Sequence, residues 1–219
     1  MVNIAANHLW FFENGIEKIC CKTVVGKPST KSPTLTSVIS RVIYYPYWNI
    51  PNSIAAKEIL PLLKKKPGYL EQMHMEVLQK DEIVENYEQI DWKQYSRNYF
   101  PFELRQKPGC DNPLGLLKFD FPNPFHTYLH DTNFKGAFLA GTRFFSHGCF
   151  RVENPDELAV ALGVPYDKID LDTCLTDKKP SYFQLPKPIP IIIIYATVDR
   201  VNNELRWYDD KYKIIKFRN

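Results

Sequence analysis

The chain has 219 residues, 44% of them hydrophobic, which suffices for one packed domain and argues against general disorder. Its net charge of +3 is too small and too evenly spread to indicate a nucleic-acid-binding protein. The longest apolar run, residues 191–196, is far shorter than the roughly 18 residues that a membrane-spanning helix needs. With 17 prolines against 9 glycines, the composition favours a sheet-rich fold with fixed turns over a helical bundle.

Strands dominate the elements expected in the N-terminal part. Apolar and β-branched runs predict strands at residues 7–12, 16–25 and 38–45. Asn14-Gly15 lies between the first two and is suited to a type I′ turn, so these strands should form an antiparallel hairpin. The N-terminus shows neither a basic region nor a cleavage site, so no signal peptide is expected in this sequence.

The middle of the chain changes character. Residues 53–65 carry apolar side chains at near-helical spacing, with Asn52 as the expected N-cap and Pro61 expected to bend or shorten the helix. Residues 69–111 are polar and weakly periodic, and we interpret them as an inserted subdomain with one or two short helices. Two interpretations stay open for this insertion: a solvated surface excursion, or a lid over a cleft.

The C-terminal half returns to strands. They are expected at residues 115–121, 125–130, 189–198 and 205–208. Asn154, Pro155 and the two acidic residues after them are typical of a helix start, so a helix should follow closely after Cys149. The pattern as a whole predicts a mainly β fold, either a sandwich of twisted sheets or a partly open barrel, with a few helices.

Five cysteines are present, at positions 20, 21, 110, 149 and 174. They include no CxxC pair, so a structural zinc site is not expected, and nothing else in the sequence implies a metal or organic cofactor. An odd count leaves at least one thiol free, and the sequence does not assign a disulfide among the other four. Cys149 lies in the stretch SHGCFRV and is the candidate nucleophile.

Two histidines could activate Cys149, because a thiol needs a base within hydrogen-bond reach to react as a thiolate. His147 lies two residues before it and would share its face in an extended segment. His130 ends an expected strand, and the 15 residues from 131 to 145 can return the chain to Cys149. Backbone amides around Gly148 and Cys149 could form an oxyanion hole. From these residues alone, a buried inert thiol is the competing interpretation.

The spacing of these residues resembles a known catalytic motif. A histidine, a gap of 15 residues, SHGC and an apolar residue resemble the motif of the L,D-transpeptidase (YkuD-type) family. The resemblance covers nearly the whole chain, since YYPYWNIPNSIAAKEILPLLKKKPGYL, NPLGLLKFDFPNPFHTYLHDT, SHGCFRVENPDELAVALG and IIIIYATVDR resemble segments of its YcbB-like branch. Many family members have Asn two residues after the cysteine, whereas this chain has Arg151, as that branch does.

The resemblance implies an enzyme that cross-links peptidoglycan. Cys149 would attack the third-residue carbonyl of a stem tetrapeptide and release D-Ala, and a diamino-acid amine of a second stem would accept the acyl group in a 3→3 cross-link. His130 is the implied general base, oriented by the backbone carbonyl of Asp131, with Gly148 in the oxyanion hole. Carbapenems are implied covalent inhibitors of the same thiol. The family works outside the cytoplasm, so a periplasmic or cell-surface location is expected.

Further residues are expected to shape the substrate site: Tyr128, Arg143, Ser146, His147 and Arg151. Ser146 should position the site or cap its turn. Tyr128 lies on the same strand face as the catalytic histidine and should line the cleft or pack beneath it. Two interpretations of Arg151 stay open: it pairs with a substrate carboxylate, or it forms a structural ion pair with Glu153 or Asp156.

The motif leaves the acceptor of the acyl group open. Water as acceptor would make the protein an L,D-carboxypeptidase, and a protein amine would make it an enzyme that attaches proteins to the wall. A non-catalytic wall-binding domain is a different class, but it would need neither His130 nor Cys149. The sequence does not give the third-position diamino acid, the oligomeric state or any further N-terminal domain.

Overall fold

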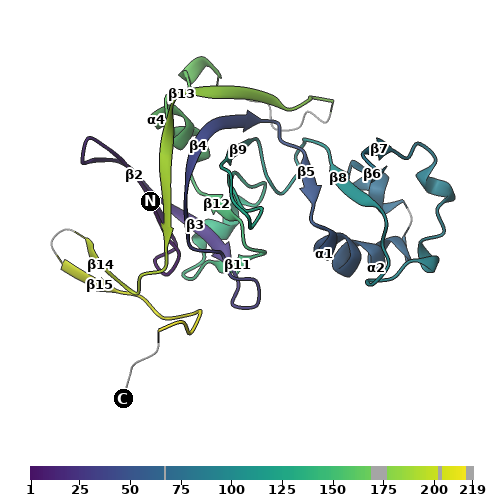
Figure 1. Ribbon diagram of the computed structural model, residues 1–219, viewed down its shortest axis with the longest axis horizontal. Helices are drawn as coiled ribbons and strands as arrows, with labels where there is room; N and C mark the ends of the chain where they lie inside the picture. The colour runs from purple at the N-terminus through teal and green to yellow at the C-terminus, as the bar shows by residue number, and fades with distance from the viewer. Residues whose placement is uncertain (67, 169–176, 202–203, 216–219) are drawn as a thin grey trace.

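A large closed sheet forms the centre of the molecule (Figure 1). The computed structural model describes residues 1–66, 68–168, 177–201 and 204–215. Nine strands follow the order β11-β3-β12-β10-β9-β4-β13-β1-β2, and β2 also pairs with β3. This extra pairing joins the two ends, so the strands from β3 to β2 close into a ring and β11 lies beside it. The prediction of a mainly β, barrel-like fold is confirmed.

The strands that build this ring differ greatly in length. They are β1 (Val2–Asn3), β2 (His8–Glu13), β3 (Ile16–Gly26), β4 (Leu35–Tyr44), β9 (Leu117–Asp120), β10 (Leu129–His130), β11 (Phe144–Ser146), β12 (Phe150–Val152) and β13 (Ser181–Ile194). The pairs β1–β13, β10–β12 and β11–β3 are parallel, and the other pairs of this sheet are antiparallel. The short parallel pair β10–β12 lies where the sequence motif places its histidine and cysteine.

Apolar side chains of the ring form the main hydrophobic core. Buried and half-buried residues alternate along β9, as expected for a strand with one face toward the core. Phe119 of β9 is fully buried in this core together with Phe150 of β12. The helix α4 (Pro155–Ala161) adds Leu158 and Ala159 to the same core. Asn154 precedes this helix as predicted, although its side chain makes no capping hydrogen bond.

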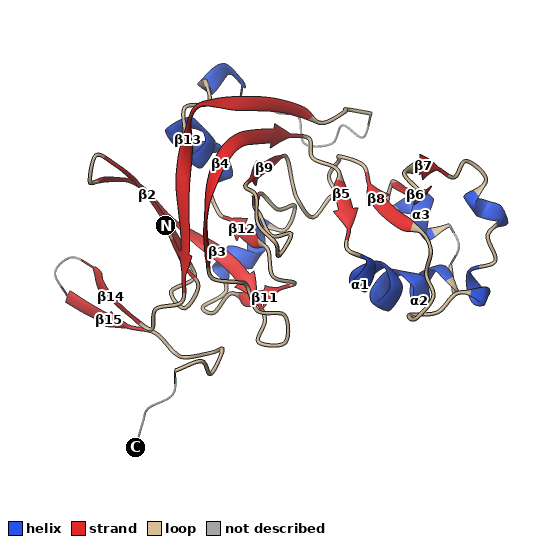
Figure 2. Ribbon diagram, in the orientation of Figure 1, coloured by secondary structure: helices blue, strands red, loops and turns tan. Residues whose placement is uncertain are grey.

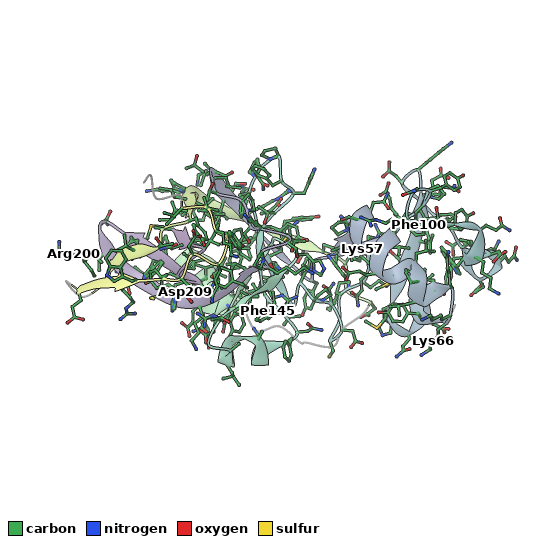
Figure 3. All side chains as sticks on the ribbon, turned by 90° about the horizontal axis from the view of Figure 1, so that it is seen from below. Lys57, Lys66, Phe100, Phe145, Arg200 and Asp209 are labelled. Atoms are coloured by element: carbon green, nitrogen blue, oxygen red, sulfur yellow. The ribbon has the colours of Figure 1, made fainter. Side chains whose placement is uncertain are left out.

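A second lobe, residues 48–106, has a sheet and a core of its own (Figure 2). Its strands are β5 (Trp48–Ile50), β6 (Met75–Gln79), β7 (Glu82–Ile83) and β8 (Glu103–Gln106), in the order β5-β8-β6-β7. Its helical segments are α1 (Asn52–Ile54), η1 (Ala55–Ile59), α2 (Leu60–Leu63), α3 (Tyr69–Gln72), η2 (Tyr87–Gln89) and η3 (Trp92–Gln94). In the perpendicular view Lys57, Lys66 and Phe100 lie on this lobe, apart from Phe145 and Arg200 (Figure 3).

The second lobe is larger than the insertion expected at residues 69–111. The core around Trp92 also includes Ile50 of β5 and Leu63 of α2, so the preceding strand and helix belong to the same unit. Short helical segments are present there as predicted (α3, η2 and η3), but the predicted insertion also contains the paired strands β6 and β8, which were not expected. Their apolar residues face the local core, so the polar appearance of the segment reflects its solvent face.

The predicted N-terminal hairpin is confirmed. Asn14 and Gly15 have φ values of 51° and 78°, and they connect β2 to β3 as a type I′ turn requires. At the other end of the chain, β14 (Val198–Val201) pairs with β15 (Glu204–Trp207), and their predicted Asn-Asn turn lies outside the described residues. The remaining 3-10 segments are η4 (Lys135–Leu139) and η5 (Tyr166–Lys168). Within the described ranges, no helix is long and apolar enough to cross a membrane.

Candidate active site

The parallel pair β10–β12 brings four of the predicted site residues together. Leu129 pairs with Phe150, and His130 with Arg151. The same register places Tyr128 beside Cys149. Because side chains two residues apart share one face of a strand, Tyr128, His130, Cys149 and Arg151 form a compact group on one face of the sheet. Strand pairing therefore positions the histidine beside the cysteine.

These four side chains line a cavity of about 550 Å³. The second lobe contributes Trp48, Pro51 and Ile54 to its wall, and the loop after β3 contributes residues 30–33. The cavity thus lies between the main sheet and the second lobe, with an apolar wall facing a group of titratable residues. Such a concave, mostly apolar site with a few convergent polar groups is typical of a substrate-binding cleft.

His130 is buried and chemically poised as a base. Its Nδ1 hydrogen bonds to the backbone carbonyl of Asp131. A carbonyl only accepts, so Nδ1 carries the proton and Nε2 is the free acceptor. Burial, aided by the positive charge of Arg151, lowers the pKa of His130 to about 3. The imidazole is therefore neutral near pH 7 and can take a proton.

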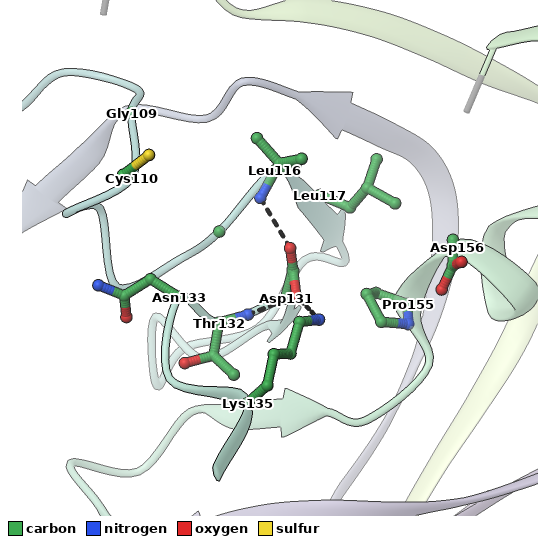
Figure 4. Close-up of a pocket in the computed structure, with 11 residues that line it drawn as sticks. Gly109, Cys110, Leu116, Leu117, Asp131, Thr132, Asn133, Lys135, Pro155 and Asp156 are labelled. Atoms are coloured by element: carbon green, nitrogen blue, oxygen red, sulfur yellow. Dashed lines mark hydrogen bonds and ion pairs between the residues drawn. The ribbon is translucent and has the colours of Figure 1, made fainter. Parts of the chain in front are cut away.

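The side-chain carboxylate of Asp131, the residue after His130, is held by hydrogen bonds and an ion pair (Figure 4). It accepts hydrogen bonds from the backbone N–H of Leu116 at 2.9 Å and of Thr132 at 2.6 Å, and it pairs with Lys135. Gly115 lies directly against it, since a Cβ there would stand 2.3 Å from Asp131 Oδ2. These groups line a separate cavity of about 430 Å³. Asp131 thus reaches His130 through its backbone carbonyl, while its side chain fixes that backbone.

Cys149 carries a free, partly exposed thiol directly before β12. Burial raises the pKa of Cys149, and hydrogen bonds from the Tyr128 backbone and from the Thr127 and Tyr128 side chains partly oppose this rise. Lys118 lies opposite His130 in the β9–β10 ladder, and its positive charge also lowers the pKa of Cys149. The resting thiol is therefore protonated near pH 7, and its activation requires a base.

Ser146 and Gly148 shape the turn that carries the nucleophile. Ser146 is 3% exposed, and its Oγ donates to the Cys149 carbonyl at 2.7 Å and accepts from the Gly148 N–H at 3.1 Å. Gly148 has a φ of +125°, a conformation that favours glycine. The Gly148 amide is thus already engaged, contrary to its expected place in an oxyanion hole. The Cys149 N–H finds no acceptor among the described residues and stays available.

Of the two remaining predicted site residues, one lines the cavity and the other does not. His147 lines the cavity and joins Glu58 of the second lobe at 2.9 Å, so it links the nucleophile turn to that lobe. Arg143 does not reach the cavity. It is buried and donates to the carbonyls of Asn7, Thr23 and Ala140, which makes it a structural brace instead of the predicted substrate contact.

Arg151 is a half-buried cation with no structural ion-pair partner among the residues that the structure describes. The ion pair with Glu153 is not formed, because Glu153 binds Lys22 at 3.0 Å. Over the described ranges no carboxylate pairs with Arg151, and its buried Nε has no acceptor. Burial lowers the pKa of Arg151, which marks the cost of keeping this charge in the cavity. An anionic group entering the cavity would compensate that charge.

Sequence reasoning missed several residues around the nucleophile. Lys118 lies 4.1 Å from the ring centre of Tyr128, and Ser32 and Thr127 donate to the Gly148 carbonyl at 2.7 Å and 3.3 Å. Lys118 could have been found only from the register of β9 against β10. Ser32 lies 117 positions before Cys149 and carries no motif, so no local signal indicates it.

Comparison with known proteins agrees with this geometry. Residues 1–170 match the family model for YkuD, the L,D-transpeptidase catalytic domain. The chain belongs to this family. A curated relative from Haemophilus influenzae, named "Putative L,D-transpeptidase", is 32% identical over 198 residues, which are 90% of this chain. The match covers 40% of that relative, so the chain spans less than half of its length. The matched family is one of L,D-transpeptidase catalytic domains.

Proposed function

We propose that this YkuD domain is a cysteine L,D-transpeptidase that forms 3→3 cross-links between peptidoglycan stem peptides. The observation that carries the proposal is the β10–β12 register, which groups a neutral His130 with the Cys149 thiol in one cavity. A base beside a thiol is the arrangement that acyl transfer through a covalent intermediate requires. Membership of the family supports peptidoglycan as the substrate.

In the first half-reaction, His130 Nε2 takes the Cys149 proton while the sulfur attacks the third-residue carbonyl of a donor tetrapeptide. The Cys149 N–H donates to the oxyanion that forms. As the intermediate collapses, the carbon–nitrogen bond to D-Ala breaks and His130 returns the proton to the leaving amine. The products of this step are free D-Ala and a thioester on Cys149.

In the second half-reaction, the side-chain amine of another stem's third residue attacks the thioester. His130 takes the proton that the attacking amine loses, and the carbon–sulfur bond breaks. The thiolate that leaves regains its proton from His130, so the enzyme returns to its starting state. A cysteine suits this route because a thioester stays reactive toward amines.

Arg151 would bind a carboxylate of the donor stem. It lies two residues after Cys149 on the same strand face, about 7 Å along the strand. The side-chain carboxylate of a third-position diaminopimelate lies at a similar distance from its L-centre carbonyl, whereas the D-Ala carboxylate lies much nearer. The planar guanidinium can hold a carboxylate through two hydrogen bonds. We therefore assign the third-residue side chain to Arg151.

The second lobe would act as a lid on this cleft, since Trp48, Pro51 and Ile54 form part of the cavity wall. A covering lobe would exclude water from the thioester and so favour an amine over hydrolysis. The domain would work outside the cytoplasm, where its substrate lies. The disulfide at Cys110 supports this location, because disulfides persist in oxidising compartments.

The direct test is product analysis with purified disaccharide-tetrapeptides. The proposal predicts free D-Ala together with a 3→3 linked dimer, and neither product from a Cys149→Ala variant. D-Ala release with tripeptide but no dimer would contradict the transpeptidase assignment and indicate an L,D-carboxypeptidase. Binding of the peptides without any D-Ala release would indicate a wall-binding domain.

A further inference from the structure

The orientation of the Gly148–Cys149 peptide is fixed from a distant part of the chain. The Gly148 carbonyl accepts a hydrogen bond from Ser32 Oγ at 2.7 Å and a longer one from Thr127 Oγ1 at 3.3 Å. In a trans peptide the N–H points opposite to the carbonyl, and the described residues contain no cis peptide bond. Holding the Gly148 carbonyl toward Ser32 therefore turns the Cys149 N–H away from it.

Ser32 is itself held rigidly. It is 5% exposed, and its Oγ accepts a hydrogen bond from the Gly26 N–H at 2.9 Å while donating to Gly148. The loop from Gly26 to Ser32 is tight, since a Cβ at Gly26 would stand 2.1 Å from the Thr30 carbonyl oxygen. A serine with both hydrogen-bonding roles occupied and little room to move can set the direction of the group it binds.

Tyr212, in the C-terminal segment, holds this loop in place through hydrogen bonds. Its hydroxyl donates to the Gly26 carbonyl at 2.6 Å and accepts from the Ser32 N–H at 3.0 Å. The ring is 3% exposed and stacks on Tyr195 at 5.0 Å between ring centres. Lys31 closes the arrangement by donating to the Tyr212 carbonyl at 2.8 Å. Tyr212 lies beyond residue 170, where the family match ends.

We propose that Ser32, held in place by Tyr212, is a positioning residue that orients the Gly148–Cys149 peptide so that the Cys149 N–H can serve as the oxyanion donor. Ser32 forms part of the cavity wall, but in this role both residues act through the Gly148–Cys149 peptide and not on the reacting sulfur. The C-terminal segment thereby becomes part of the catalytic apparatus. This inference rests on the proposed acyl transfer at Cys149, because only that reaction develops an oxyanion beside the amide.

Two reactions of the same thiol separate positioning from general structural support. Under the proposed function, meropenem would acylate Cys149 through an oxyanion intermediate, whereas iodoacetamide alkylates a thiol by displacing iodide and forms no oxyanion. Both rates can be measured at Cys149 by mass spectrometry of its peptide, which is necessary because Cys20 is also an exposed free thiol. We expect Ser32→Ala to slow acylation about 10- to 100-fold, less than the loss of an oxyanion donor itself, and to leave alkylation unchanged.

Tyr212→Phe removes both hydroxyl contacts while keeping the ring, and we expect it to slow acylation about 3- to 10-fold with alkylation again unchanged. It also serves if Ser32→Ala fails to fold. Ser37→Ala is the matched control, because Ser37 also donates to one backbone carbonyl, that of Pro122 at 2.6 Å, but lies outside the site. This control should change neither rate.

The outcomes separate the hypotheses. Unchanged acylation in both variants would overturn the positioning role while leaving the proposed function intact. Acylation and alkylation falling together would overturn it as well, because loss of both reactions indicates a disturbed fold or blocked access. A wild-type protein that is alkylated but never acylated would overturn the proposed function, and the positioning role with it.

Discussion

Cys149 and His130 lie in one cavity as two neutral groups. Burial raises the pKa of the thiol and lowers that of the imidazole to about 3, so near pH 7 the proton stays on sulfur. In the proposed reaction, the proton would therefore pass from Cys149 to His130 during attack on the substrate, in contrast to a resting thiolate–imidazolium pair. The electrostatics of the site favour a thiol that reacts only when a carbonyl is in place.

This protonation state predicts the pH dependence of acylation. In the proposed reaction, His130 can no longer act as a base once it is protonated, and its lowered pKa places that protonation far below the usual histidine range. The raised pKa of Cys149 keeps the thiol protonated to mildly alkaline pH. The rate of meropenem acylation should thus be nearly constant between about pH 5 and 8. A rate that falls below a midpoint near 6.5 would contradict this account.

Arg151→Gln should weaken the reaction with the donor peptide specifically. Losing a charge-assisted hydrogen bond of about 1.5–3 kcal/mol should lower kcat/KM roughly 10- to 100-fold. A donor whose third-residue carboxylate is amidated should react equally slowly with wild type and variant. Arg206→Gln, an exposed change on the C-terminal hairpin, is the control. If the variant still prefers the carboxylate over the amide as wild type does, Arg151 does not bind that group.

The placement of individual site residues could be predicted from the sequence only where their spacing along a strand determines which side chains share a face. The alternation of Tyr128 with His130, and of Cys149 with Arg151, follows from strand geometry alone. The brace formed by Arg143 could not be predicted, since it contacts Asn7 and Thr23 more than 100 positions away. Its proximity to the motif in sequence suggested a cleft residue, but the tertiary fold turns it into the interior.

At the scale of elements, the turn before β9 helps to position His130. Gly115 adopts a φ of +60° and packs against the clamped carboxylate of Asp131. This contact couples the turn before β9 to the backbone carbonyl that orients His130. The short strands β9 and β10 thus depend on a glycine, a buried carboxylate and Lys135 for their exact placement.

Gly115→Ala should therefore impair both stability and catalysis. The positive φ and the 2.3 Å approach to Asp131 Oδ2 should cost about 1–3 kcal/mol and displace the carboxylate. We expect a lower melting temperature and meropenem acylation slowed at least tenfold. Gly141→Ala is the matched control, since nothing lies within 4 Å of a Cβ there. A Gly115→Ala protein that reacts at the wild-type rate would contradict the proposed role of this clamp.

Elements with strong local signals were predictable, and those set by long-range pairing were not. Asn14-Gly15 specifies its hairpin turn by itself, because few residues adopt two successive positive φ values. The strands β6 and β8 were missed because each is short and mixes charged with apolar residues. Their pairing joins residues 25 to 31 positions apart, for which the sequence offers no local signal.

At the scale of the whole molecule, the two hydrophobic cores are separate. The ring encloses one core, while Trp92, Phe100 and Phe102 centre the other in the second lobe. The cavity with Cys149 lies where the two units meet, and the His147–Glu58 contact bridges them. Both partners of that contact are substantially exposed, so it should add little to stability and permit the lobe to move.

Trp92→Ala should destabilise the second lobe selectively. Trp92 is 3% exposed, so its removal should cost about 3–5 kcal/mol. In hydrogen exchange, amides of β6 and β8 should lose protection while those of β3 and β13 keep theirs. Phe119→Ala, which opens the other core, should have the opposite pattern. Equal loss of protection in both units would show that they unfold as one, against the independence that a mobile lid needs.

The central claim, that Cys149 is an acyl-accepting nucleophile activated by His130, is tested most directly by intact-protein mass spectrometry with meropenem. The account predicts one covalent adduct on the wild-type protein, no adduct on Cys149→Ala, and slower adduct formation on His130→Ala. A folded wild-type protein that forms no adduct, or an adduct that persists in Cys149→Ala, would contradict it.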